Sequence, residues 1–213
     1  MIRQFGRGML IALSISLVLV CGPQSVSRAS LQEGSKEAAL NNAMRKLWED
    51  HITWTRVFII SAVAGSPDKD AATQRLLQNQ VDIGNAIKPF YGNAAGDQLT
   101  ALLKDHIVIA ADVVTAAKAN DKPKLDDANK RWSDNADQIA AFLSKANPKN
   151  WPESEMRTML HDHLKLTTNE AVARIQGDWA ADVKAYDAVH EEILHMADGL
   201  SMGIVKQFPD KFK

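Results

Sequence analysis

Apolar residues recur at intervals of three and four along most of this chain, a spacing typical of amphipathic helices. The first such stretch runs from Gln32 to Ala64 almost without helix-breaking residues, and Gly65–Asp68 ends it. A second stretch ends near Pro89–Gly92. Four more follow, with breaks at Asn120–Pro123, Asn147–Pro148 and Gly177–Asp178. The pattern therefore predicts six helices and an all-α fold.

One short motif occurs three times within these stretches. Each copy has an apolar residue, a variable residue, Asp, His and an aliphatic residue, and the copies are Trp48–Ile52, Leu103–Ile107 and Leu160–Leu164. The motif histidines, His51, His106 and His163, are 55 and 57 residues apart. A regular spacing of this kind indicates an internal repeat.

The same repeat is visible at the predicted helix ends. Gly65, Asn120 and Gly177 each stand 14 residues after a motif histidine. Gly and Asn are the residues that best tolerate the left-handed conformation that closes a helix. We therefore predict a six-helix bundle of three antiparallel αα-hairpins, at about 32–92, 96–148 and 152–209, within one domain over 30–213.

Residues 1–29 have the pattern of a secretory signal peptide. Arg3 and Arg7 precede an apolar run from Met9 to Val20, and small residues, Ser27 and Ala29, precede the predicted cleavage point. An uncleaved membrane anchor is one alternative, but the run is shorter than the roughly 20 residues of a spanning helix. We expect an exported protein, periplasmic or extracellular, with no stable membrane span after cleavage.

Cleavage after Ala29 changes both the charge and the cysteine content. A lipoprotein attached at Cys21 is a second alternative, although bulky Val20 stands where a small residue is expected. Cleavage would remove three arginines and no acidic residue, which takes the formal charge from −1 to −4. It would also remove Cys21, the only cysteine, so the mature chain could form no disulfide. Neither charge favours a nucleic-acid partner, which usually requires a basic surface.

A turn of about 100° per residue places the three motif histidines near the middle of the apolar stripes and points the preceding aspartates elsewhere. Asn79 and Asn135 occupy similar positions in the second helices of the first two hairpins. At 1.5 Å per residue, His106 and Asn135 both lie roughly 20 Å from the turn that joins their helices. In the third hairpin the aligned residue is Val189, and the nearest polar residue is His190.

Two interpretations of the inward histidines are open. Each imidazole could donate to a partner such as an Asn amide and serve only the packing of the core. Alternatively, His51, His106 and His163 could converge as ligands of Zn, Cu, Ni or Fe, supported by Asn79 and Asn135. Convergence of the three rings would favour a metal or small-ligand site, and separate His–Asn pairs would favour a structural module.

Glu170 is the further residue of interest for such a site. It stands seven residues after His163 on the same stripe, so it could act as a fourth ligand or orient a histidine. It could equally form an i,i+4 ion pair with Arg174. The segment His190–His195 resembles the zinc-protease motif HExxH, but its histidines are five apart, which separates them by about 140°.

No stretch has the pattern of a phosphate loop, a dinucleotide fingerprint or a nucleophile elbow. We therefore assign no catalytic residue, and we expect a binding or accessory protein rather than an enzyme. The alternative is a structural or protein-interaction module in which the histidines only pack. A protein partner or a small ligand fits either interpretation.

Three segments resemble a family of small exported bacterial helical proteins for which no activity is established. They are Leu47–His51 with Trp54–Arg56, Arg131–Trp132 with Asn135–Asp137, and Gly203–Pro209. The resemblance covers most of the predicted mature chain. It implies an all-α fold and exported location, and it assigns no chemistry to any residue.

Overall fold

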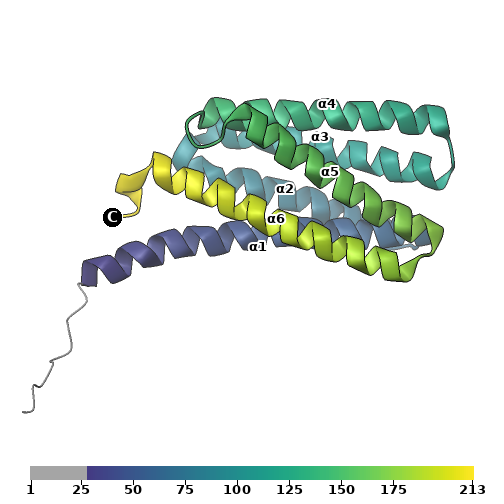
Figure 1. Cartoon of the computed structure of the whole chain (residues 1–213), viewed down its shortest axis with the longest axis horizontal. Coiled ribbons are helices and arrows are strands. Elements are labelled where there is room, and N and C mark those ends of the chain that lie inside the picture. The colour runs from purple at the N-terminus through teal and green to yellow at the C-terminus, as the bar shows by residue number, and fades with distance from the viewer. Residues whose placement is uncertain (1–27) are drawn as a thin grey trace, which may run out of the picture.

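The computed structural model describes the backbone of residues 28–213 and the side chains of residues 36–213, so nearly all of the predicted signal peptide lies outside the described residues. The prediction of an all-α fold is confirmed within that range (Figure 1). The elements are α1 (Arg28–Ala64), α2 (Lys69–Tyr91), α3 (Asn93–Lys118), α4 (Lys122–Ala146), α5 (Glu153–Gln176), α6 (Trp179–Gln207) and a short 3-10 turn, η1 (Pro209–Lys211).

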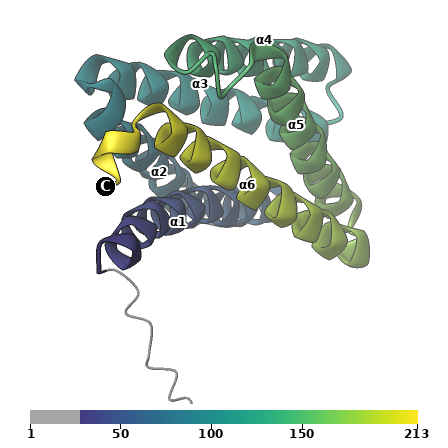
Figure 2. The same ribbon diagram turned by 60° about the vertical axis from the view of Figure 1, so that its left-hand side comes forward.

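Each helix packs against the next one along the chain, and α6 returns to pack against α1. The six helices therefore form a closed ring of antiparallel neighbours (Figures 1 and 2). In addition, α1, α3 and α5 contact one another across the interior of the bundle. Both views show α5 and α6 diverging from the loop that joins them.

The three predicted helix ends take the left-handed conformation. The φ angles are 68° at Gly65, 53° at Asn120 and 73° at Gly177, and Asn120 is the sole non-glycine residue with positive φ in the described range. At each end the next residue's amide donates to the carbonyl five residues earlier: Ser66 to Ser61, Asp121 to Ala116, and Asp178 to Ala173. These bonds satisfy carbonyls that the helix itself leaves free.

One apolar core, to which all six helices contribute, extends along the bundle, and tryptophans at Trp48, Trp132 and Trp151 are buried in it. A smaller apolar cluster, which includes Phe58 and Leu76, lies where α1, α2, α3 and α5 meet. Across the described residues, no helix combines the length and apolar character that membrane crossing requires.

Gly84→Ala is expected to lower the free energy of unfolding by about 1–3 kcal/mol, the usual cost of overpacking. A Cβ at Gly84 would lie 1.9 Å from Oγ1 of Thr100 and 2.6 Å from the carbonyl oxygen of Gly96, where α2 and α3 approach closely. Gly199→Ala in α6 is the control, because a Cβ there meets no atom within 4 Å. Urea unfolding should show a loss for Gly84→Ala and none for Gly199→Ala, which gains helix propensity.

Candidate functional site

The three motif histidines come together in the interior of the bundle. His51 from α1, His106 from α3 and His163 from α5 are 3%, 4% and 4% exposed. The ring centroids of His51 and His163 are 5.7 Å apart, and those of His106 and His163 are 6.5 Å apart. The contacts among α1, α3 and α5 therefore bring the repeated residue of each motif into one cluster.

The Nδ1 atom of each histidine contacts a side chain 29 residues further along the chain. The pairs are His51 with Gln80 at 3.2 Å, His106 with Asn135 at 2.8 Å, and His163 with Glu192 at 2.8 Å. We term these six residues the histidine layer. The predicted partners did not include Gln80 or Glu192, although the constant separation of 29 residues is present in the sequence and points to both.

The hydrogen-bond partners of the three histidines agree only in part with the predicted ones. Asn135 bonds to His106 as expected. The third partner is Glu192 and not His190, since His190 bonds to Glu49 at the surface, 3.0 Å away. The side chain that contacts His51 Nδ1 is Gln80 and not Asn79, and Asn79 accepts instead from the amide of Gln80 at 3.1 Å.

The two asparagines tie their helices to the preceding one at the level of the layer. Asn79 Nδ2 donates to the carbonyl of Leu47 at 2.9 Å, and Asn135 Nδ2 donates to the carbonyl of Leu102 at 3.1 Å. Both acceptors stand four residues before a motif histidine. In each hairpin, the second helix therefore binds a carbonyl of the first helix one turn before the histidine. This bond fixes how the second helix is rotated against the first.

Both ring nitrogens of His106 are occupied. Its Nδ1 donates to Oδ1 of Asn135, because an amide oxygen can only accept. Its Nε2 then carries the lone pair and accepts from the indole Nε1 of Trp132 at 3.2 Å. His106 is therefore a fully bonded neutral imidazole, and its nitrogen could ligate a metal only if Trp132 moved away.

Burial keeps two of the histidines neutral. The pKa of His106 is lowered to about 4, mainly by desolvation and also by the neighbouring His163, against the hydrogen bond with Asn135. Desolvation also lowers the pKa of His51 well below its usual value, with contributions in the same direction from the other two histidines. Three imidazoles placed this close cannot all carry a proton without repulsion in a low-dielectric interior.

Glu170 belongs to a separate group of charged residues rather than to the histidine layer. Its Oε1 lies 2.7 Å from Nη1 of Arg56 in α1, so the predicted i,i+4 pair with Arg174 is not formed. Arg174 pairs instead with Asp182 at 3.2 Å, and Asp182 also binds Arg56 at 2.9 Å. We term Arg56, Glu170, Arg174 and Asp182 the ionic cluster; burial raises the pKa of Glu170 to about 7, although Arg56 opposes this.

Four buried polar atoms near the histidine layer have no hydrogen-bond partner: Trp48 Nε1, Gln80 Oε1, Thr167 Oγ1 and Glu192 Oε1. Trp48 lies edge-on to His51, with ring centroids 5.7 Å apart, and Thr167 follows His163 by one turn of α5. Within residues 28–213, however, no group of three or more His, Cys, Asp or Glu side chains is arranged to hold a metal ion. The layer is polar and buried, and its donors and acceptors are only partly matched.

No protein-family model, no curated protein and no solved structure matches the chain. The family resemblance of the three sequence segments therefore stays a prediction.

Proposed function

We propose that this chain is an exported, non-catalytic helical binding or accessory protein in which the three histidines serve the architecture of the bundle. The observation that supports this most directly is His106, whose two ring nitrogens are both engaged by Asn135 and Trp132. A reactive or metal-binding imidazole needs a free nitrogen that can reach its ligand. Here the ring is buried and held from both sides.

We also propose that the bundle is a threefold repeat of one αα-hairpin. The constant separation of 29 residues between each histidine and its partner supports this proposal. The matching left-handed residues at the three helix ends support it independently. In this view the histidine layer is the polar contact at which the three units recognise one another, because polar groups in a core penalise other helix registers.

Metal analysis combined with melting curves tests the structural role. We expect the protein, purified after expression of the full chain, to contain no stoichiometric metal and to melt at the same temperature with and without chelator. His106→Ala should lower the melting temperature, because it leaves a cavity and removes the partner of Asn135 and Trp132. Stoichiometric metal that is lost in the variant, together with a chelator-sensitive melt, would contradict the proposal.

A small polar ligand or metal ion within the layer is the second candidate. The four unpartnered atoms around the histidines favour it, because buried polar groups normally have a partner. Gln80 Oε1 and Glu192 Oε1 are acceptors that a cation or a hydrogen-bond donor would satisfy. Native mass spectrometry of the same preparation separates the two roles: a retained mass absent from His106→Ala would favour this candidate.

A further inference from the structure

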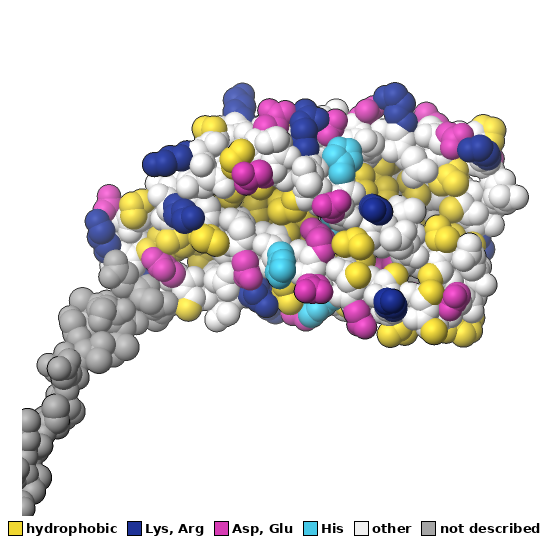
Figure 3. Space-filling model, in the orientation of Figure 1, with side chains coloured by type: hydrophobic (Ala, Val, Ile, Leu, Met, Phe, Trp, Pro, Cys, Tyr) yellow, Lys and Arg dark blue, Asp and Glu magenta, His cyan; other side chains and the backbone are white. Residues whose placement is uncertain are grey.

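The divergence of α5 and α6 leaves a groove on the surface of the bundle. It has a volume of about 670 Å³, and all ten residues that line it come from these two helices. Figure 3 shows this face, where apolar side chains between acidic ones are visible. Small-molecule sites in proteins usually have volumes of about 300–1,000 Å³, so the groove has the size of such a site.

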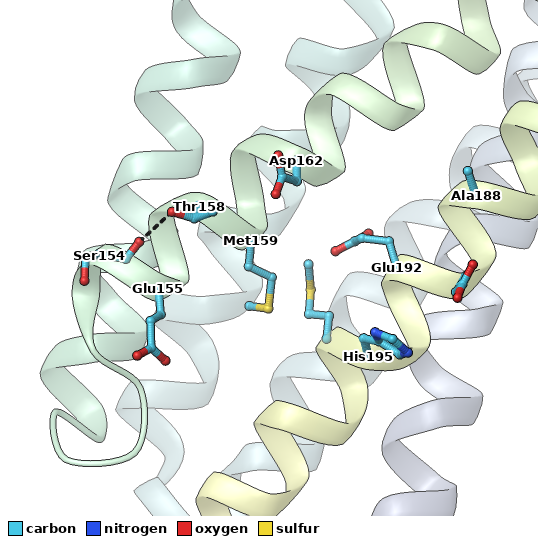
Figure 4. A pocket seen from close by; sticks show the side chains of 10 residues that line it. Ser154, Glu155, Thr158, Met159, Asp162, Ala188, Glu192 and His195 are labelled. Atoms are coloured by element: carbon cyan, nitrogen blue, oxygen red, sulfur yellow. Dashed lines mark hydrogen bonds between the residues drawn. The ribbon is translucent and has the colours of Figure 1, made fainter.

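Two methionines form the apolar part of the groove. Figure 4 shows Met159 projecting from α5 into the groove, towards α6. Met196 from α6 is only 1% exposed and continues into the core. Thioether side chains are flexible and polarisable, and they adapt to apolar ligands of different shapes.

Four carboxylates also line the groove, beside His195 and the small residues Ser154, Thr158 and Ala188. Glu155 and Asp162 project from α5, and Glu191 and Glu192 from α6. No lysine or arginine is among the lining residues, and within the described side chains none of these four carboxylates pairs with one. Outside the groove, by contrast, α5 does supply a basic partner for a carboxylate, since Arg157 lies 2.6 Å from Asp137 of α4.

Glu192 connects the groove to the interior. Its Oε2 is bound to His163 at 2.8 Å, which fixes the side chain at the inner edge of the groove. Its Oε1 is buried and has no hydrogen-bond partner. Figure 4 shows the carboxylate directed from α6 towards α5, between Met159 and Asp162. The groove therefore has a carboxylate of fixed position at its inner edge, beside its apolar part.

We propose that the groove between α5 and α6 binds a small organic cation with an apolar body. The four carboxylates, none of which pairs with a lysine or arginine of the described part of the chain, select a positive charge, and the two thioethers accept an alkyl or aromatic group. A bare metal ion would leave the methionine surface unused, and no group of His, Cys, Asp or Glu in the described residues is arranged for one. Glu192 belongs to both the groove and the histidine layer, whereas the other nine lining residues lie outside the layer.

Calorimetric titration with three probes tests the chemistry of the ligand. Octyltrimethylammonium, kept below its micellar concentration, carries both the charge and the apolar body. We expect it to bind with one-to-one stoichiometry and to lose affinity in high salt. Octyl sulfate has the same chain with the opposite charge, and tetramethylammonium has the charge alone, so both should bind at least tenfold more weakly. Equal binding of octyl sulfate would overturn the proposal.

Matched variants locate the site. Asp162→Asn removes one groove charge, whereas Asp105→Asn removes the equivalent aspartate of the second motif, which is exposed and lies on α3 outside the groove. We expect about threefold weaker binding of octyltrimethylammonium for Asp162→Asn and no change for Asp105→Asn. Adding Glu155→Gln and Glu191→Gln to Asp162→Asn should weaken binding at least tenfold.

Two further readouts keep the test decisive. All three substituted residues of the triple variant are exposed, so its circular dichroism spectrum and melting temperature should match those of the wild type. Amide chemical shifts in nuclear magnetic resonance spectra should change on α5 and α6 when octyltrimethylammonium is added. Shifts confined to other helices, or unchanged affinity in a folded triple variant, would refute the groove as the site.

Discussion

Arg56→Met is expected to lower the free energy of unfolding by about 3–5 kcal/mol, the usual cost of breaking a buried ion pair. Arg56 is the residue that binds both carboxylates of the ionic cluster, Glu170 at 2.7 Å and Asp182 at 2.9 Å. The two carboxylate side chains are each 2% exposed, and Asp182 keeps its ion pair with Arg174, so the loss falls mainly on Glu170. Methionine keeps most of the apolar stem, so the loss measures the charge and its hydrogen bonds.

Arg45→Met is the matched control for this effect. Arg45 pairs with Asp198 at 2.6 Å, but these side chains are 38% and 36% exposed, so about 1 kcal/mol or less should be lost. Urea unfolding at pH 5 and pH 8 adds a second test. At pH 5 Glu170 should be protonated and neutral, so losing the Arg56 guanidinium should cost less free energy than at pH 8, where Glu170 is charged. The effect of Arg56→Met should therefore be larger at pH 8. Equal losses for the two arginine variants would show that the ionic cluster contributes little.

Acidification from pH 7 to pH 4.5 is expected to destabilise the protein through its buried histidines. The folded-state pKa of His106 is lowered to about 4, while that of an unfolded histidine is about 6.5. As the pH falls below 6.5, His106 takes up a proton in the unfolded chain but not in the folded one. The stability that is present above pH 6.5 is therefore lost. This costs about 2–3 kcal/mol for His106 by pH 4.5, and His51 acts in the same direction.

Glu170 has the opposite effect over the same interval. Its pKa is raised to about 7 in the folded state, so the folded protein takes up this proton before the unfolded chain does. As the pH falls, Glu170 therefore contributes about 2–3 kcal/mol of stability, which nearly cancels the loss from His106. We expect the wild type to lose stability between pH 7 and pH 4.5 through His51, whose pKa is also lowered by burial.

Glu170→Gln separates these contributions, because glutamine cannot take up the compensating proton. Urea unfolding across this pH range should show that the variant loses about 2–3 kcal/mol more stability than the wild type. Asp105→Asn, at an exposed residue, is the control and should follow the wild type. A wild-type stability that stays flat to pH 4.5, together with an unchanged slope in Glu170→Gln, would mean that neither group titrates as its burial implies.

Much of the fold and part of the layer were predictable from local sequence alone. The period of apolar residues determines which face of a helix is buried, and Gly65, Asn120 and Gly177 determine where the odd-numbered helices end. The inward direction of His51 and its two counterparts follows from the same period. These features depend on residues within a few turns of one another, so they need no knowledge of how the helices cross.

Only the tertiary structure decided which side chains meet. Asn79 and Gln80 differ by about 100° around α2, so choosing the contact to His51 Nδ1 requires the rotation of α2 against α1. The same holds for Glu192 and for the pairing of Glu170 with Arg56, 114 residues away in sequence. The groove depends on the angle between α5 and α6, which is set by ridges and grooves along both helices. Such contacts depend on the relative position of several helices, whereas the periodic pattern of one helix specifies only its own buried face.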